Sequence, residues 1–118
     1  MNEHSFFYWA VETLDNLEKQ LIIVDSQGIL DIERLGQDAL EISYKDISSK
    51  TQTYLLNVRS SLKQIWLSSP VSGPSHFVCQ KDGWKNAKDM MLEDLLSSEL
   101  GKVLHLVPNL KPKSSESE

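Results

Sequence analysis

Helical periodicity occurs near the two ends of this sequence and not between them, and this arrangement constrains the fold most strongly. Apolar residues recur on one helical arc from Ser5 to about Val24, and again from about Lys88 to Leu104. Between them lie short runs such as "ILDIERL", "ALEISY" and "TYLLNV", in which apolar and polar residues alternate as in strands. Parallel neighbouring strands need long crossover connections, and no helical pattern separates these runs. The sequence therefore predicts a two-layer α+β sandwich, with both helices on one face of a largely antiparallel sheet.

The chain of 118 residues has the length of one domain. We expect this domain to span residues 1–110 and the polar stretch 111–118 to be a disordered tail. No apolar run approaches the ~20 residues of a membrane-spanning helix, so no membrane segment is expected. Cys79 is the single cysteine, which excludes an internal disulfide. Because Cys79 lies two residues after Phe77 on a predicted strand and so shares its face, we expect its thiol to be buried.

Acidic residues are concentrated in the first half of the chain. Residues 1–56 contain ten Asp and Glu against four Lys and Arg, whereas residues 57–118 contain seven against eight. Nucleic acid is disfavoured as a partner, because binding to phosphates needs a basic stripe. The first half is better suited to a cation or to a basic protein surface.

Five carboxylates form a candidate metal site. Glu12, Asp15 and Glu18 fall side by side on the predicted first helix, opposite its apolar arc. Asp31 and Glu33 share one face of the first predicted strand. Carboxylates without His or Cys favour hard cations, or ferrous iron held weakly at exchangeable sites. The alternative interpretation is a solvated helix face beside an ordinary strand exterior.

The segment "LKQIWLSSPVSGP" contains a tryptophan on the polar side of a predicted strand. Ile65 and Leu67 point to one face and should meet the helices, whereas Gln64 and Trp66 point to the other. Trp66, with Gln64 beside it and Asn57 on the neighbouring strand, is typical of an anchor in a protein interface. The alternative is that a loop or tail covers Trp66. The Pro- and Ser-rich stretch "SSPVSGP" is predicted to be a loop.

Familiar catalytic motifs are absent from the sequence. The three histidines are scattered without ligand spacing, and neither a G-x-S-x-G elbow nor a Gly-rich phosphate loop is present. Whether the protein is an enzyme is therefore left open by the residues themselves.

The segment "KQIWLSSPVSGP", together with "TLDNLE" near the start and "LLSSEL" in the last helix, closely resembles the frataxin family. The resemblance covers nearly the whole chain from the first helix to about Leu104, and the central segment is close to a family signature. It implies two helices against one face of a twisted antiparallel sheet. It also implies weak iron binding by carboxylates that correspond to Glu12, Asp15, Asp31 and Glu33. Docking through the open sheet face is implied at Asn57, Gln64 and Trp66.

The resemblance implies a role as an iron-binding accessory protein of iron–sulfur cluster assembly. Its expected partners are the cysteine desulfurase and the iron–sulfur scaffold protein, and its expected ligand is Fe²⁺ or Fe³⁺, weakly bound. The alternative function is a ferroxidase that oxidises Fe²⁺ with O₂ and stores or delivers iron. We expect a monomer, with an iron-dependent oligomer as the alternative. The expected compartment is the mitochondrial matrix or a mitochondrion-derived organelle, and the alternative is the bacterial cytoplasm.

Overall fold

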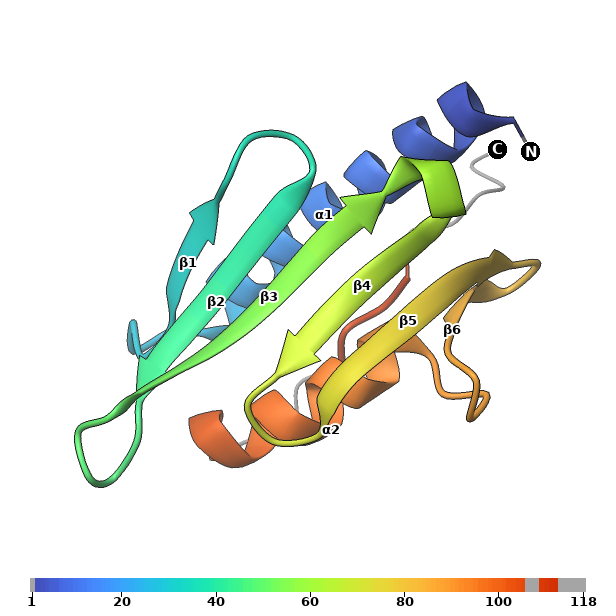
Figure 1. Cartoon of the computed structure of the whole chain (residues 1–118). Coiled ribbons are helices and arrows are strands. Elements are labelled where there is room, and N and C mark those ends of the chain that lie inside the picture. The colour runs from blue at the N-terminus through green and yellow to red at the C-terminus, as the bar shows by residue number, and fades with distance from the viewer. Residues whose placement is uncertain (1, 106–108, 113–118) are drawn as a thin grey trace.

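The computed structural model describes residues 2–105 and 109–112, and it has one helix near each end with six strands between them (Figure 1). In chain order the elements are α1 (Glu3–Val24), β1 (Asp31–Arg34), β2 (Ala39–Lys45), β3 (Thr51–Arg59), the short 3₁₀ turn η1 (Ser60–Leu62), β4 (Gln64–Ser69), β5 (Gly73–Gln80), β6 (Gly83–Lys85) and α2 (Leu92–Leu104). The strands lie in the sheet in chain order, and every neighbouring pair is antiparallel. Both helices lie behind the sheet in Figure 1, so the predicted two-layer α+β sandwich is confirmed.

Side-chain hydrogen bonds define the start of helix α1 and the turn that follows it. The side chain of Asn2 accepts a hydrogen bond from the N–H of Ser5, which satisfies one of the free donors of the first turn. Beyond the last turn, the carboxylate of Asp25 accepts from the N–H groups of Ile29 and Leu30, which fixes the turn into β1. The buried stripe of the helix repeats at helical spacing and comprises Phe6, Ala10, Thr13, Leu14, Leu17 and Leu21.

The core lies between the two helices and one face of the sheet. Tyr54 and Leu56 of β3 and Ile65 and Leu67 of β4 point into it and are almost fully buried. The pairs Val58 with Ile65 and Leu56 with Leu67 lie directly opposite each other, so apolar side chains stack across the ladder. Each such fully buried aliphatic side chain contributes about 1.5–3 kcal/mol to folding. The prediction that Ile65 and Leu67 face the helices is confirmed.

The connection between β4 and β5 is shorter than predicted. The expected loop at residues 68–74 is wrong at both ends, because β4 continues to Ser69 and β5 begins at Gly73. The hydroxyl of Ser69 accepts from the N–H groups of Val71 and Ser72 and donates to Glu99 of α2. These bonds hold a tight turn, which lets the ladder continue to the residues on either side of it.

Helix α2 begins at Leu92 and not near Lys88, so the predicted start is wrong by about one turn. The side chain of Asn86 accepts from the N–H groups of Lys88 and Met90, which holds this stretch as a turn. Asp89 has a positive φ of 63° within this turn, a conformation that a helix cannot contain. Farther along α2, the carboxylate of Glu99 accepts from the hydroxyl of Tyr54 and so ties the helix to β3.

The C-terminal segment returns to the helices. Leu110 is buried in the core, and its N–H donates to the hydroxyl of Ser97 on α2. Lys111 is hydrogen-bonded through its N–H and its carbonyl to Gln20, and its carbonyl also accepts from Asn16. The predicted tail at 111–118 thus starts at a residue held by α1, and residues 113–118 lie outside the described part. In the described ranges, no helix is both long and apolar enough to cross a membrane.

The β5–β6 hairpin leaves Cys79 exposed, so the prediction of a buried thiol is wrong. Cys79 pairs with Trp84 two residues before the turn at Lys81 and Asp82, at the corner of the sheet. Alternation along β5 places Cys79 on the same face as Phe77, but it does not show whether another segment covers that position. Trp84 itself is buried, and its indole N–H donates to the hydroxyl of Thr13 on α1.

Candidate functional site

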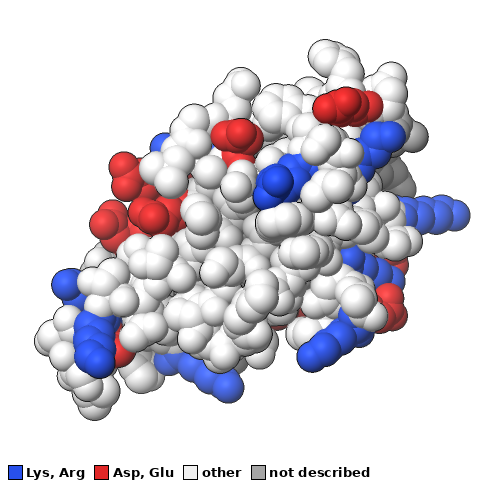
Figure 2. All heavy atoms as spheres, viewed as in Figure 1, with Lys and Arg blue, Asp and Glu red and all other residues white. Residues whose placement is uncertain are grey.

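The face of the sheet opposite the helices is open and carries a cluster of acidic side chains at its β1 edge. Figure 2, which has the same viewpoint as Figure 1, shows acidic side chains gathered at the β1 end, while basic side chains are scattered over the rest of the view, several of them toward β5 and β6. Most of this face is white in Figure 2, because polar uncharged and apolar residues occupy the centre. The face therefore has an acidic edge at β1, whereas charges of both signs occur toward β5 and β6.

Trp66 lies at the centre of the open face and is held from two sides. The imidazole of His76 stacks on the indole, with ring centroids 4.2 Å apart and planes 8° from parallel. The guanidinium carbon of Arg59 lies 4.1 Å from the centroid of the indole, within range of a cation–π interaction. Because Arg59 is on β3 and His76 is on β5, the two groups approach the indole from the two strands that flank β4.

The residues beside Trp66 fix its orientation. The indole N–H donates to the side-chain oxygen of Gln64 at 2.7 Å, and Asn57 pairs directly with Trp66 across the β3–β4 ladder. The structure therefore brings together all three residues predicted to bind a partner. Trp66 is neither buried nor fully exposed, because Arg59 and His76 cover the two faces of its ring and leave the edge open.

Arg59 was not among the residues predicted from the sequence. It lies two residues after Asn57 on β3, so the period of two in a strand places it on the same face. Its position diagonal to Trp66 depends on the β3–β4 register, in which Arg59 pairs with Gln64. The alternation was visible in the sequence, but the register was not.

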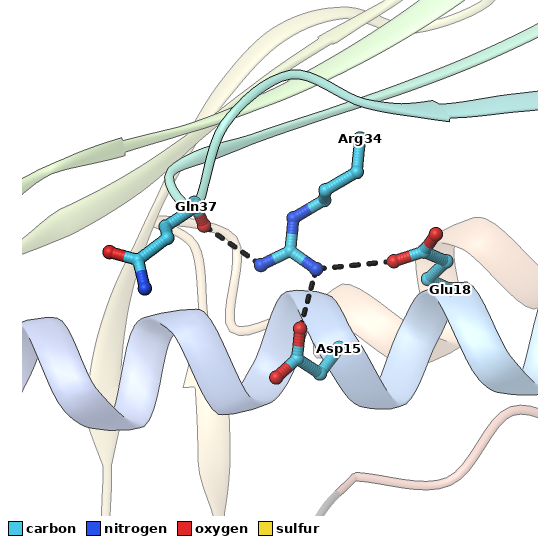
Figure 3. A network of polar contacts seen from close by, with 4 residues as sticks. All are labelled: Asp15, Glu18, Arg34 and Gln37. Carbon is cyan, nitrogen blue, oxygen red and sulfur yellow. Dashed lines mark hydrogen bonds and ion pairs between the residues drawn. The ribbon is translucent and has the colours of Figure 1, made fainter.

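The predicted carboxylates of α1 are joined by an arginine that the sequence analysis did not consider. Figure 3 shows Arg34 of β1 extending between Asp15 and Glu18, which lie on the helix below it. Its Nη1 atom is 2.5 Å from a carboxylate oxygen of Asp15 and 3.2 Å from one of Glu18. Nη2 donates to the backbone carbonyl of Gln37, and Nε is buried without a hydrogen-bond partner among the described residues. An internal cation therefore already neutralises part of this carboxylate group.

The two predicted carboxylates of β1 lie on the open face of the sheet and are separated from Arg34, which contacts α1. Asp31 and Glu33 are exposed, and Glu33 pairs directly with Glu41 of β2 across the ladder. Like charges directly opposite each other on adjacent strands repel, and a bound cation relieves this repulsion. Glu41 is a third carboxylate of this edge that the sequence analysis missed, because the β1–β2 register decides its position.

The five predicted metal residues therefore divide into two groups. Asp15 and Glu18 meet at Arg34, with Glu12 three residues earlier on α1, while Asp31 and Glu33 lie on the open side of β1. Within residues 2–105 and 109–112, no three His, Cys, Asp or Glu side chains are arranged to enclose a metal ion. Chemically, the arrangement suits cations held at the surface by one or two carboxylates, with water completing the coordination.

Two terminal helices on one face of a six-stranded antiparallel sheet place the chain in the class of two-layer α+β domains with one open sheet face. Within that class, the family described as the frataxin-like domain matches residues 1–106. The chain therefore belongs to the frataxin family, as the resemblance of its "QIWLSSPVSGP" segment implied.

Curated relatives include mitochondrial frataxins from two eukaryotes. The chain is 40% identical over 68 residues to the mitochondrial frataxin of Caenorhabditis elegans, which is 56% of this chain and 50% of that relative. It is 31% identical over 103 residues to the mitochondrial frataxin homolog of Schizosaccharomyces pombe, which is 75% of this chain and 65% of that relative. The aligned parts thus span between half and about two thirds of the length of these relatives.

Solved frataxin structures share the fold. The frataxin of Psychromonas ingrahamii superposes with a TM-score of 0.77 over 94% of this chain and 99% of that chain, at 17% identity. Yeast frataxin superposes with a TM-score of 0.66 at 26% identity, covering 86% of this chain and 82% of that chain. A trimeric Saccharomyces cerevisiae frataxin complexed with ferrous iron is 30% identical with a TM-score of 0.56, each chain being 78% covered.

Proposed function

We propose that this protein is an iron-binding accessory protein of iron–sulfur cluster assembly, and that it docks on the cysteine desulfurase–scaffold complex through the open face of its sheet. The observation that carries this proposal is Trp66, held between Arg59 and His76 at the centre of an uncovered sheet face. A held indole loses little conformational freedom on binding, and tryptophan and arginine are the residues most enriched at interface hot spots. Membership of the frataxin family supports the same partner class.

The charges around Trp66 favour one orientation of the docked partner. The acidic edge at β1 favours a basic region of the partner, and the basic residues near β5 and β6 favour an acidic one. Such an uneven charge distribution fixes the orientation of the partner more than it raises the affinity, because exposed charge pairs each contribute little. Trp66, Asn57 and Gln64 supply the neutral centre of the contact.

Iron is proposed to bind weakly at the carboxylates of the acidic edge. Asp31 and Glu33 lie free of Arg34 and face solvent, so they are the accessible ligands. At Asp15 and Glu18, an incoming Fe²⁺ ion has to compete with the guanidinium of Arg34. A site built from a few surface carboxylates releases its ion readily, which suits delivery of iron more than tight storage.

The docking proposal is tested by measuring the affinity of the purified desulfurase–scaffold complex for the wild type and for Trp66→Ala. A hot-spot tryptophan contributes about 2 kcal/mol or more, so the variant should bind about 30-fold more weakly. Tyr8→Ala is the matched control, because Tyr8 is also a large exposed aromatic residue but lies on α1. Equal affinity for all three proteins contradicts the proposal.

The iron proposal is tested by anaerobic titration with Fe²⁺. Asp31→Asn combined with Glu33→Gln should remove most of the binding, whereas Asp15→Asn should remove less because Arg34 already neutralises Asp15. Oxygen consumption after addition of Fe²⁺, if it is abolished in the double variant, favours the ferroxidase alternative instead. Sizing with and without Fe²⁺ separates the proposed monomer from an iron-dependent oligomer.

We propose a mitochondrial location, or a mitochondrion-derived organelle, because the two eukaryotic relatives described above are named as mitochondrial proteins. Fractionation of the source cells, with antibody detection of the endogenous protein, tests this assignment. Detection only in the cytosolic fraction contradicts it.

A further inference from the structure

A cleft of about 380 Å³ opens beside the outer side of β5, and His76 is the one described lining residue that also belongs to the docking site proposed above. One wall consists of Pro74, Ser75 and His76 of β5. The other wall is the turn at residues 86–90, and Leu95 of α2 also lines the cleft. Its volume lies within the range of about 300–1,000 Å³ that is usual for ligand-binding pockets.

The strand that lines this cleft has an unpaired edge. Strand β4 pairs with β5 from Gly73 to Val78, whereas β6 pairs with β5 only from Val78 to Gln80. Among the described strands, residues 73–77 therefore have β4 as their single neighbour. In an antiparallel pair, alternate residues direct their N–H and C=O groups away from the partner strand. Those groups form an edge to which another chain can add, although Pro74 removes one donor and limits the addition to a short strand.

Among the described residues, the lining of the cleft carries one ammonium group, that of Lys88, and no Asp or Glu, whereas the whole chain has a formal net charge of −5. The nearby aspartates Asp82 and Asp89 pair with Lys85, and Asp94 lies next to Leu95 in the first turn of α2. Lys88, on the wall of the cleft, forms no ion pair within the described part of the chain. Its ammonium group is thus available to an external carboxylate.

Three of the lining residues supply apolar surface. Met90 and Leu95 line the cleft together with the ring of Pro74. An apolar side chain of a bound segment can be buried there, at about 25 cal/mol for each Å² removed from water. The cleft therefore combines an open strand edge, one unpaired cation and an apolar floor.

We propose that this cleft binds an extended acidic segment of a partner protein. The segment adds alongside residues 73–77 of β5 as a short strand, and its backbone accepts and donates the hydrogen bonds that β6 does not supply. One carboxylate of the segment pairs with Lys88, and an apolar side chain on its other face contacts Met90 and Leu95. The imidazole of His76 connects this cleft to Trp66, so the two contacts are adjacent on one surface. The inference goes beyond the proposed function, because it requires neither iron nor the desulfurase.

Peptide binding tests this inference directly. The probe is an acetylated peptide of about eight residues in which Glu and Val alternate, titrated into the ¹⁵N-labelled protein. We expect saturable shifts of the amide signals of His76 and Lys88, which weaken as salt is added. A peptide with Lys in place of every Glu should not bind. Equal binding of the two peptides, or no binding of either, overturns the proposal.

Two variants with different mechanisms localise the binding. Lys88→Glu should weaken it at least about tenfold, and Ala87→Trp should block the cleft sterically without any change of charge. Lys45→Glu is the matched control, because it makes the same charge change at the far side of the sheet and should bind as the wild type does. Unchanged affinity in correctly folded Lys88→Glu and Ala87→Trp proteins also overturns the proposal. Loss of docking on the desulfurase complex leaves this peptide result unaffected, so the two proposals fail separately.

Discussion

Replacement of Arg34 by methionine tests whether the carboxylates of α1 depend on an internal cation. Methionine retains the length of the apolar stem but removes the guanidinium, which contacts Asp15, Glu18 and the carbonyl of Gln37. The side chain of Arg34 is 17% exposed, and those of Asp15 and Glu18 are 41% and 28% exposed. These contacts are therefore partly screened by solvent and partly protected from it.

The expected loss of stability follows from these contacts. Each partly exposed ion pair contributes about 0.5–1 kcal/mol, and the hydrogen bond to the Gln37 carbonyl contributes about 1 kcal/mol. The buried Nε atom, which has lost water without gaining an acceptor, offsets part of this gain. We therefore expect Arg34→Met to lower the free energy of unfolding by about 2 kcal/mol. For a chain of this length, that corresponds to a decrease of about 8 °C in Tm.

Urea unfolding of a double-mutant cycle measures this effect. Arg34→Met is made in the wild type and in a background that carries Asp15→Asn and Glu18→Gln. In the neutral background, the same substitution should cost only about 1 kcal/mol, because the ion pairs are already absent. The variant should also bind Fe²⁺ more tightly, since Asp15 and Glu18 lose their competitor. A loss below about 0.5 kcal/mol, or an equal loss in both backgrounds, would refute the reasoning.

Three further predictions concern stability and its dependence on pH. Burial raises the pKa of the Glu93 carboxyl above its ordinary value of 4.5, and the N–H of its own residue offsets this only in part. Stability should therefore fall as the pH rises from below 4.5 through the raised pKa, and urea unfolding of Glu93→Gln should show a smaller fall. Trp84→Phe removes the hydrogen bond to Thr13 and some core volume, so it should cost about 1–2 kcal/mol in thermal unfolding, and an unchanged Tm argues against it. Trp66→Ala should change stability by less than about 1 kcal/mol, because the indole lies outside the core, and loss of cooperative unfolding would show otherwise.

The layers of the fold were predictable because they depend on patterns within single segments. The apolar stripe of α1 repeats at helical spacing, and the alternation around Trp66 shows which residues face the helices. The absence of a helix between the strands was enough to predict an antiparallel sheet. These features do not depend on how distant segments meet.

Contacts between segments were not predictable in the same way. Arg34 was visible on its strand, but its position over Asp15 depends on how β1 crosses α1. Alternation indicates that Arg59 shares a face with Trp66, and that Glu41 shares one with Glu33. The contacts within each pair depend on strand register. A single sequence contains no direct signal for register, because every shift by two residues preserves the alternation.

Local side-chain bonds explain the errors at the element boundaries. Apolar periodicity permits α2 to begin near Lys88. However, the side-chain oxygen of Asn86 accepts from the N–H groups of Lys88 and Met90 and so holds these residues in a turn instead of a helix. Ser69 shortens the β4–β5 turn in the same way. At Cys79 the burial was predicted wrongly, because alternation indicates the face of a residue but not which distant segments cover it.

The most direct test of the proposed function is cysteine-dependent sulfide production by a purified desulfurase–scaffold complex from the same source, titrated with this protein. The proposal predicts a saturable change in rate with the wild type. It also predicts that Trp66→Ala shifts the midpoint of the titration to about 30-fold higher concentration, in line with its weaker binding. No change in rate at any concentration of the wild type, or identical titrations of the wild type and Trp66→Ala, would contradict docking through the open face.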